Sequence, residues 1–174
     1  MRLANKVALG TGGGTGIGEA IAKAFAREGA KVAITGRRKE ELERVIKDIE
    51  RNGGKALALP GSVTNEADVQ EAIATTLKTF GRLDVLVNNA GITRDNLLLR
   101  MKDEEWDAVI ATNLSSIFLT SKAFVRGMLK QRHGRIINIS SVIGAMGNAG
   151  QANYAAAKAG IVGFSKSLAR EVGS

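Results

Sequence analysis

Two side chains four positions apart near the end of the sequence have the types that proton transfer needs. Tyr154, the only tyrosine, and Lys158 would share one face of a helix, because positions i and i+4 are neighbours there. A free phenol has a pKa of about 10, too high for proton transfer near pH 7. Lowering it to about 7 requires about 4 kcal/mol, and a positive charge about 4 Å away in an effective dielectric of about 20 supplies that much. The pair suits acid–base chemistry, although the same spacing is common in helices with a purely structural role.

A second candidate is the segment from Val7 to Gly18, which reads V-A-L-G-T-G-G-G-T-G-I-G. Glycine has no Cβ, so the backbone can turn tightly there and approach a ligand closely. The N-terminus of a following helix offers unpaired N–H groups and about half a positive charge to an anion. A strand, a glycine turn and a helix in this order predict a pyrophosphate site for a dinucleotide. The alternative is a glycine-rich turn without a ligand, and Gly10 is unusual for a buried strand.

Alternating strands and helices must position these residues. Apolar segments predict strands starting at Val7 and at 31–35, 55–59, 84–87 and 135–139. Helical periodicity lies between them, with the longest stretches at about 103–132 and 151–172. This order predicts βαβ units in a parallel sheet with helices on both faces. We expect a Rossmann-like, doubly wound α/β fold of three layers in a single dinucleotide-binding domain.

The apolar residues of the helical segments predict which helix faces are buried. The helix after the glycines is expected to turn one set of residues inward: Ile17, Ala20, Ile21, Ala24 and Phe25. The helix at 103–132 is expected to pack through another set: Trp106, Ile110, Leu114 and Phe118. His133 is expected to be a cation at the C-terminal end of that helix.

Ligands bind beyond the carboxyl ends of the strands in such a sheet. The unusual residues of this sequence follow the strands at that end: the glycine turn, Gly36-Arg37-Arg38, Pro60-Gly61-Ser62-Val63, Asn88-Asn89-Ala90-Gly91 and Ser140-Ser141. Arg37 lies 19 positions after Gly18, where an acidic residue holds the ribose hydroxyl in NAD-binding proteins. Because a guanidinium can bond to a 2′-phosphate, the sequence favours NADP(H) over NAD(H). The alternative is a pair of solvated arginines before a helix.

The composition limits the function classes. The chain has no cysteine and one histidine, so disulfides and cysteine or histidine metal sites are not expected. Apolar runs are short and the N-terminus is unlike a secretory signal, so we expect no membrane span and a cytoplasmic location. The net charge of +8 would suit nucleic acid or an acidic partner. However, basic residues are dispersed and aromatic residues make up only 4%, which favours anionic ligands over nucleic acid.

Several segments together make the sequence resemble the short-chain dehydrogenase/reductase family. They occur in the family's order across the chain: T-G-G-G-T-G-I-G at 11–18, N-N-A-G at 88–91, N-L-S-S at 113–116, I-S-S at 139–141 and Y-A-A-A-K at 154–158. Ser141 precedes Tyr154 by 13 positions, as in many members. Residues 88–113 and 140–171 are most similar to the 3-oxoacyl-(acyl-carrier-protein) reductases of that family.

The resemblance implies NADPH-dependent reduction of a 3-ketoacyl thioester to a 3-hydroxyacyl thioester in fatty acid synthesis. It implies that Tyr154 is the general acid and that Ser141 hydrogen-bonds the carbonyl oxygen. Lys158 would lower the tyrosine pKa and bind the nicotinamide ribose, and Asn113 would hold a proton-relaying water. The cofactor would contact Gly12, Gly13, Gly14, Thr15, Gly16, Ile17, Gly18, Arg37, Arg38, Ser62, Val63, Asn89, Ala90, Gly91, Tyr154 and Lys158. At position 62 family members usually carry Asp or Asn.

The resemblance also implies partners. Family members associate through the helices that carry Asn113 and Tyr154, so a homo-oligomer is expected, and the fifth strand would be an exposed sheet edge. An acidic acyl carrier protein could bind a basic face formed by some of five residues: Arg100, Lys102, Lys130, Arg132 and Arg135. Family members usually continue past residue 174, with two further strands and substrate-covering helices. The competing interpretations are a dinucleotide-binding half-domain without turnover and a basic nucleic-acid-binding module.

Overall fold

The computed structural model describes residues 1–173 of the chain. These residues divide into two compact units. Unit 1 comprises Met1–Ala90 and Leu119–Ile137, and unit 2 comprises Gly91–Phe118 and the described residues from Asn138 onward. The expected single domain stays a prediction.

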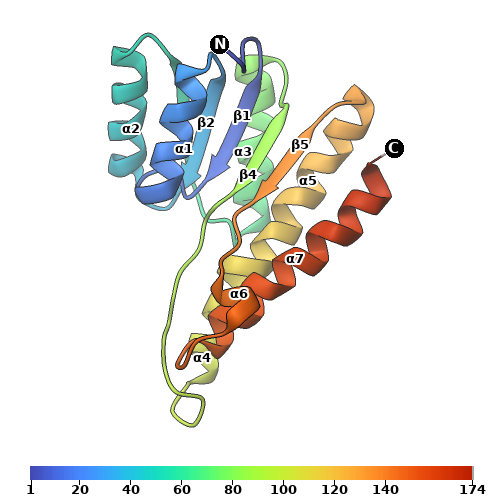
Figure 1. The fold of residues 1–174 in the computed structure, drawn as a ribbon. Helices are drawn as coiled ribbons and strands as arrows, with labels where there is room; N and C mark the ends of the chain where they lie inside the picture. Colours follow the sequence, from blue (N-terminus) through green and yellow to red (C-terminus); the bar gives the residue numbers. More distant parts are fainter. Residues whose placement is uncertain (174) are drawn as a thin grey trace. The chain divides into compact units, whose positions relative to one another are not determined.

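Unit 1 is built on a five-stranded sheet with the strand order β3-β2-β1-β4-β5 (Figure 1). The strands are β1 (Val7–Thr11), β2 (Lys31–Gly36), β3 (Lys55–Pro60), β4 (Val85–Asn88) and β5 (Arg135–Asn138). β1 pairs in parallel with β2 and with β4, and β2 pairs in parallel with β3. The doubly wound α/β fold expected from the sequence is confirmed.

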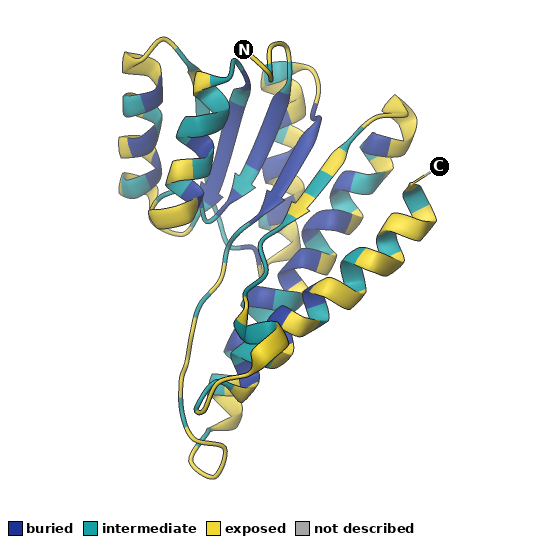
Figure 2. Ribbon diagram, in the orientation of Figure 1, coloured by how far each residue is buried: buried dark blue, intermediate teal, exposed yellow. Residues whose placement is uncertain are grey.

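Helices cover both faces of this sheet. α1 (Gly16–Arg27) and α2 (Lys39–Arg51) lie on one face, and α3 (Glu66–Phe80) lies on the other (Figure 1). From Leu119 onward, α5 (Ser116–Gln131) also belongs to this unit. One buried cluster joins α1 and α2 to the sheet: Ala22, Ala30, Val32, Ile34, Leu42, Val45 and Ile49. Figure 2 shows the central strands buried, whereas β5 at the edge is partly exposed and Ile137 is 40% accessible.

Unit 2 is mostly helical. It contains α4 (Asp103–Ile110), a π-helical turn η1 (Ala111–Ser115), the short α6 (Ile143–Met146) and the long α7 (Ala152–Val172). α7 packs against all three of the others. Glycines permit this packing, because a Cβ at Gly160 would lie 2.9 Å from the Leu114 Cδ2 atom and one at Gly144 would lie 2.8 Å from the Ala159 nitrogen.

Two of the predicted buried faces were partly wrong. On α1, Ile17 is 64% exposed and Ala20 is also exposed, whereas the side that packs on the sheet includes the buried Ala22. In the helix at 103–132, Trp106 is 40% and Phe118 is 50% exposed. The buried stripe follows other, mostly smaller residues: Val109, Asn113, Ile117, Thr120, Phe124 and Met128.

The continuous helical stretch Asp103–Gln131 is 29 residues long and, by length and composition alone, apolar enough to cross a membrane. A core helix of a soluble protein has the same properties. Here α4 and η1 pack against α7 in unit 2, and Phe124 and Met128 of α5 are buried. Packing within the two units therefore buries part of this apolar stretch.

Asp84, just before β4, is fully buried and connects three strands of unit 1. Its Oδ2 atom accepts hydrogen bonds from the Val7 N–H at 2.9 Å and the Arg82 Nε at 2.9 Å. Its backbone N–H bonds to the Val7 carbonyl, and its carbonyl accepts from the Arg135 N–H, both at 2.9 Å. His133, expected to be a helix C-terminal cation, has its Nε2 atom 3.9 Å from the Asp84 Oδ1 and 3.2 Å from the Lys6 Nζ.

We expect Asp84→Asn to lower the free energy of unfolding at pH 7 by about 2 kcal/mol, because an amide nitrogen replaces a charged acceptor. Burial alone raises the pKa of the Asp84 carboxyl, but the Arg82 guanidinium and the Val7 N–H outweigh it and lower that pKa below its usual value. A lowered folded-state pKa stabilises the fold above the unfolded pKa of about 4, and the stabilisation is lost as the pH falls through the folded value.

Urea unfolding from pH 7 down to pH 3 would measure this effect, with Glu40→Gln, an exposed carboxylate on α2, as the matched control. The difference in the free energy of unfolding between the wild type and Asp84→Asn should become smaller below about pH 4, because the wild-type carboxyl then gains a proton. A difference that stays constant down to pH 3 would contradict the role given to the ionised carboxylate.

Candidate active site

The residues predicted to form the site fall into two groups, one in each unit. Unit 1 holds the glycine turn and the residues after β2, β3 and β4: Gly12–Gly18, Arg37, Arg38, Ser62, Val63, Asn89 and Ala90. Unit 2 holds Gly91 and the four expected catalytic residues: Asn113, Ser141, Tyr154 and Lys158. Unit 1 thus holds most of the residues expected to contact the cofactor, and unit 2 holds the four expected catalytic residues.

In unit 1, the glycines of the turn differ in what they permit. Gly12 and Gly16 have φ angles of +64° and +57°, which L side chains rarely adopt, and a Cβ at Gly16 would meet open space. A Cβ at Gly13 would lie 2.5 Å from the Ile34 Cβ, so this glycine lets the turn pack on β2. A Cβ at Gly18 would lie 2.0 Å from the Gly12 carbonyl oxygen, so this glycine lets α1 begin close beneath the turn.

The turn is tied to the end of β4. The Thr11 hydroxyl accepts hydrogen bonds from the backbone N–H groups of Asn89 and Ala90, both at 3.0 Å. The Asn89 side chain donates to the carbonyl oxygens of Thr11 and Gly12, both at 3.2 Å. The N-N-A-G segment therefore stabilises the glycine turn, and the Asn89 side-chain amide nitrogen is used in those hydrogen bonds.

The ends of β2 and β3 lie level with this turn. In the sheet register Thr11 faces Thr35, and Gly36 faces Pro60. Arg37 and Arg38 are exposed beyond β2, and the Arg38 Nη2 atom donates to the Thr15 hydroxyl at 3.3 Å. After β3, the Ser62 N–H donates to the Asp68 Oδ2 at 2.7 Å and Val63 is buried.

These features of unit 1 fit a dinucleotide. The left-handed Gly16 stands beside open space directly at the start of α1, where helix N–H groups are unpaired. Thr15, the N-cap residue, makes no side-chain capping hydrogen bond, so its hydroxyl does not occupy the N–H groups at the start of α1. Arg37 and Arg38, both exposed, follow at the end of the next strand.

In unit 2, Lys158 is a buried cation. The residue is 5% exposed, and its Nζ atom donates to the Ile139 carbonyl at 2.8 Å. The same Nζ atom lies 5.6 Å from the centre of the Tyr154 ring. Burial lowers the pKa of the Lys158 ammonium. The structure thus places Tyr154 and Lys158 together, as the i and i+4 spacing predicted.

The two serines after β5 have different roles in unit 2. The Ser140 hydroxyl donates to the carbonyl of Lys158 at 2.9 Å, which joins this segment to α7. The Ser141 hydroxyl oxygen accepts from the Ile143 N–H at 3.2 Å. The Ser141 hydroxyl hydrogen is not used in that contact, and a substrate oxygen could accept it.

Asn113 lies in the π-helical turn and is fully buried. Its Oδ1 atom accepts from the Ile92 N–H at 2.8 Å, and its Nδ2 atom donates to the Ile92 carbonyl at 2.9 Å. A Cβ at Gly91 would lie 3.4 Å from the Asn113 Oδ1, so the segment after β4 packs closely on this amide. Both ends of the side chain hold the backbone at Ile92.

Asn153 is a site residue that the sequence did not single out. It is fully buried, and its Oδ1 atom accepts from the Tyr154 N–H at 2.8 Å. Its Nδ2 atom donates to the carbonyls of Arg94 at 2.9 Å and Glu105 at 3.3 Å. This amide ties the tyrosine's backbone to the loop before α4 and to α4 itself. A buried amide next to the tyrosine was visible in the sequence, but its partners lie about 50 residues away and were not.

Comparisons with known proteins agree with this geometry. A family model described as short chain dehydrogenase matches residues 6–174. The chain is 57% identical over 174 residues to the 3-oxoacyl-(acyl-carrier-protein) reductase FabG of Escherichia coli K12, covering 100% of this chain and 70% of that protein. It is 56% identical to the FabG of Vibrio cholerae with the same coverage. It is 54% identical over 173 residues to a 3-oxoacyl-(acyl-carrier-protein) reductase of Synechocystis, covering 99% of this chain and 70% of that one.

The expected family is thereby confirmed along nearly the whole chain. The chain belongs to the short-chain dehydrogenase family of oxidoreductases.

Proposed function

We propose that this chain reduces the ketone of a 3-ketoacyl thioester to an alcohol, with NADPH as the cofactor and Tyr154 as the general acid. The observation that carries the proposal is the buried Lys158 ammonium beside the Tyr154 ring. A cation held in a low-dielectric site favours negative charge on a neighbouring oxygen far more than a solvated one does. The relatives named 3-oxoacyl-(acyl-carrier-protein) reductase support the substrate class.

The dinucleotide, when bound, supplies the hydride that the carbonyl carbon accepts. Tyr154 gives its phenolic proton to the carbonyl oxygen, so the products are an alcohol and a tyrosinate. The Lys158 ammonium stabilises that tyrosinate until a proton returns from solvent. The Ser141 hydroxyl donates a hydrogen bond to the same carbonyl oxygen and orients it.

Asn113 would act through its backbone. Because both polar atoms of its side chain bond to Ile92, a relay water near Lys158 would bind the main-chain carbonyl of Asn113. The side chain then fixes the π turn that positions this carbonyl. This refines the role that the family resemblance implied for Asn113.

The remaining parts of the site would hold the cofactor. Gly12–Gly18 and the start of α1 bind the pyrophosphate, and Ser62 and Val63 flank the adenine. Asn89, Ala90 and Gly91 line the cofactor, and Lys158 binds the nicotinamide ribose. Arg37 and Arg38 bind the 2′-phosphate of NADPH, which NADH lacks.

We further propose a cytoplasmic homo-oligomer that accepts acyl-carrier-linked substrates. Exposed apolar side chains on helices support self-association: Phe118, Leu129 and Val162 are 50%, 56% and 44% exposed. Sedimentation of the purified chain would measure it, and a monomer at micromolar concentration would contradict it. Of the basic residues expected to meet the carrier, Arg100 and Lys102 belong to unit 2, and Lys130, Arg132 and Arg135 to unit 1.

The test is a fluorescence titration with NADPH and NADH, followed by a short 3-ketoacyl thioester. We expect NADPH to bind at least about tenfold more tightly than NADH, because an arginine–phosphate pair contributes at least about 1.4 kcal/mol. Arg37→Ala should remove most of that preference. Arg51→Ala, the same change at the far end of α2, should leave it unchanged.

The titration separates the proposal from its alternative. Binding with thioester reduction supports the reductase, and binding without turnover supports a dinucleotide-binding chain that has no catalytic role. Equal affinity for the two dinucleotides would reject the part given to the arginines. Binding of neither would reject the proposed function.

A further inference from the structure

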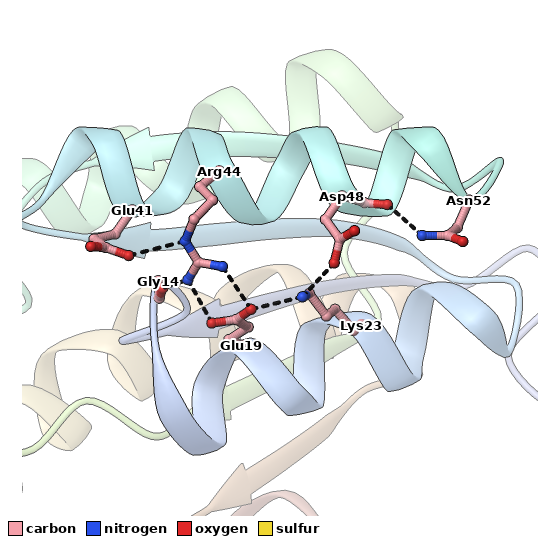
Figure 3. A network of polar contacts seen from close by, with 7 residues as sticks. All are labelled: Gly14, Glu19, Lys23, Glu41, Arg44, Asp48 and Asn52. Atoms are coloured by element: carbon pink, nitrogen blue, oxygen red, sulfur yellow. Dashed lines mark hydrogen bonds and ion pairs between the residues drawn. The ribbon is translucent and has the colours of Figure 1, made fainter.

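A line of charged side chains joins α1 to α2 in unit 1 (Figure 3). Arg44 of α2 donates two hydrogen bonds to Glu19 of α1, from Nη1 to Oε1 at 3.0 Å and from Nη2 to Oε2 at 2.7 Å. Lys23 of α1 pairs with both Glu19 and Asp48. A paired guanidinium–carboxylate contact of this type is both strong and geometrically specific.

The same guanidinium also holds the glycine turn. The Arg44 Nη2 atom donates to the Gly14 carbonyl oxygen at 3.1 Å, and Nε donates to the Glu41 Oε2 at 3.2 Å (Figure 3). A Cβ at Gly14 would lie 3.1 Å from the Cβ of Glu41, so the middle of the turn rests directly on the first turn of α2. α2 therefore supports the turn from behind, and Arg44 is the polar part of that support.

Glu19 makes this support electrostatically important. It lies in the first turn of α1, the helix whose N-terminus is the proposed pyrophosphate site. Hydrogen bonds from Arg44 and then Lys23 lower the pKa of the Glu19 carboxyl to about 2, so it is an anion at neutral pH. An unpaired carboxylate there would compete with a phosphate for the positive end of the helix.

We propose that Arg44 is a positioning residue for dinucleotide binding. It fixes the Gly14 carbonyl and, together with Lys23, pairs with the Glu19 carboxylate, so that the start of α1 presents its N–H groups to the pyrophosphate without an unpaired carboxylate beside them. Arg44 acts through Gly14 and Glu19 rather than by touching the cofactor. This inference rests on the proposed dinucleotide site and adds a residue that neither the glycine pattern nor the family resemblance identified.

The first experiment uses the chain without a ligand. Hydrogen–deuterium exchange of the backbone amides at 13–19 should become about tenfold faster in Arg44→Ala, because the turn loses a hydrogen bond to a charged donor worth about 1.4 kcal/mol or more. The matched control is Asp48→Asn, which breaks the Lys23–Asp48 pair at the other end of the same line and leaves Arg44 in place. Equal exchange at 13–19 in the two variants would overturn the role of Arg44 in holding the turn.

The second experiment measures NADPH affinity. We expect the Kd to rise at least about tenfold in Arg44→Ala and to stay within about twofold in Asp48→Asn. Arg44→Lys should bind NADPH more tightly than Arg44→Ala, because lysine restores the positive charge. The double variant Arg44→Ala with Glu19→Gln should also bind NADPH more tightly than Arg44→Ala, because it removes the carboxylate with which Arg44 pairs.

The outcomes distinguish this inference from the proposed function. A wild-type affinity in Arg44→Ala, or a double variant no better than Arg44→Ala, would overturn the inference while the dinucleotide site stands. A wild-type chain that binds no dinucleotide would overturn the proposed function and with it the part of Arg44 in binding. The exchange experiment needs no ligand and still decides whether Arg44 holds the turn.

Discussion

Replacing Lys158 with methionine is expected to slow ketone reduction about 10³-fold and to raise the free energy of unfolding by about 1 kcal/mol. The rate falls because no cation remains to stabilise the tyrosinate. The stability rises because a buried ammonium with one carbonyl partner is exchanged for an apolar side chain of similar length. A group that costs stability and is needed for turnover has the signature of a functional residue.

The pH dependence of that stability difference has a definite sign. Burial holds the folded-state pKa of Lys158 below its unfolded value of about 10.4. Between these two pKa values the unfolded chain binds more protons than the folded chain. The free energy of unfolding of the wild type therefore rises as the pH increases from the folded-state pKa to the unfolded-state pKa of Lys158. The difference in the free energy of unfolding between Lys158→Met and the wild type should be largest at neutral pH and should become smaller as the pH approaches about 10.4.

Urea unfolding and steady-state rates on the same variants would test both effects. Lys166→Met, an exposed lysine of the same helix, is the matched control and should change neither quantity appreciably. Tyr154→Phe should lose turnover to a similar extent with a smaller change in stability. If Lys158→Met were destabilised relative to Lys166→Met, the ammonium would be a stabilising structural group, and its functional interpretation would fail.

Gly18→Ala is expected to weaken NADPH binding at least about 100-fold and to lower the free energy of unfolding by about 3 kcal/mol. The added methyl would lie 2.0 Å from the Gly12 carbonyl oxygen and 2.6 Å from the Asn89 Nδ2 atom. Because the first contact is backbone, relief requires the glycine turn to move. Such a shift changes the surface that the pyrophosphate would meet.

Gly10→Ala provides the matched control. It adds the same methyl in the preceding strand, where the nearest atom, the Ile34 Cγ2, lies 4.0 Å away. The glycine that is unusual for a buried strand thus has no close neighbour, and alanine should stabilise the chain by about 0.5–1 kcal/mol. Fluorescence titration and thermal unfolding would compare the two, and equal NADPH affinity in Gly18→Ala and wild type would contradict the role of Gly18.

The sequence predicted the elements of the sheet well because their signals are local. β2 was expected at 31–35 and is Lys31–Gly36, and β3 was expected at 55–59 and is Lys55–Pro60. The last helix was expected at 151–172 and is Ala152–Val172. Short apolar runs closed by glycine or proline carry this information within a few residues. The pairing of Tyr154 with Lys158 was predictable for the same reason, since helix geometry alone brings i and i+4 together.

The orientation of the long helix at 103–132 was predicted less well. Its aromatic residues suggested a face through Trp106 and Phe118, yet both are substantially exposed and the π turn at Ala111–Ser115 lies between them. A π turn alters the angular step per residue, and a periodicity count assumes that this step is constant. Within this turn the Asn113 amide bonds to the backbone of Ile92, a contact across 21 residues that no local pattern reveals.

From the sequence alone, the chain's α/β class, its family, its glycine turn and its tyrosine–lysine pair followed from local spacing and ordered motifs. The tertiary structure alone decided which residues support them. Arg44 meets Glu19 across 25 positions, Asn153 meets Arg94 across 59, and Asp84 meets Val7 across 77. Nothing local distinguishes these polar residues from solvated ones. Their partners are set by which strands and helices become neighbours, and the free energy of the whole core, rather than any short pattern, determines that arrangement.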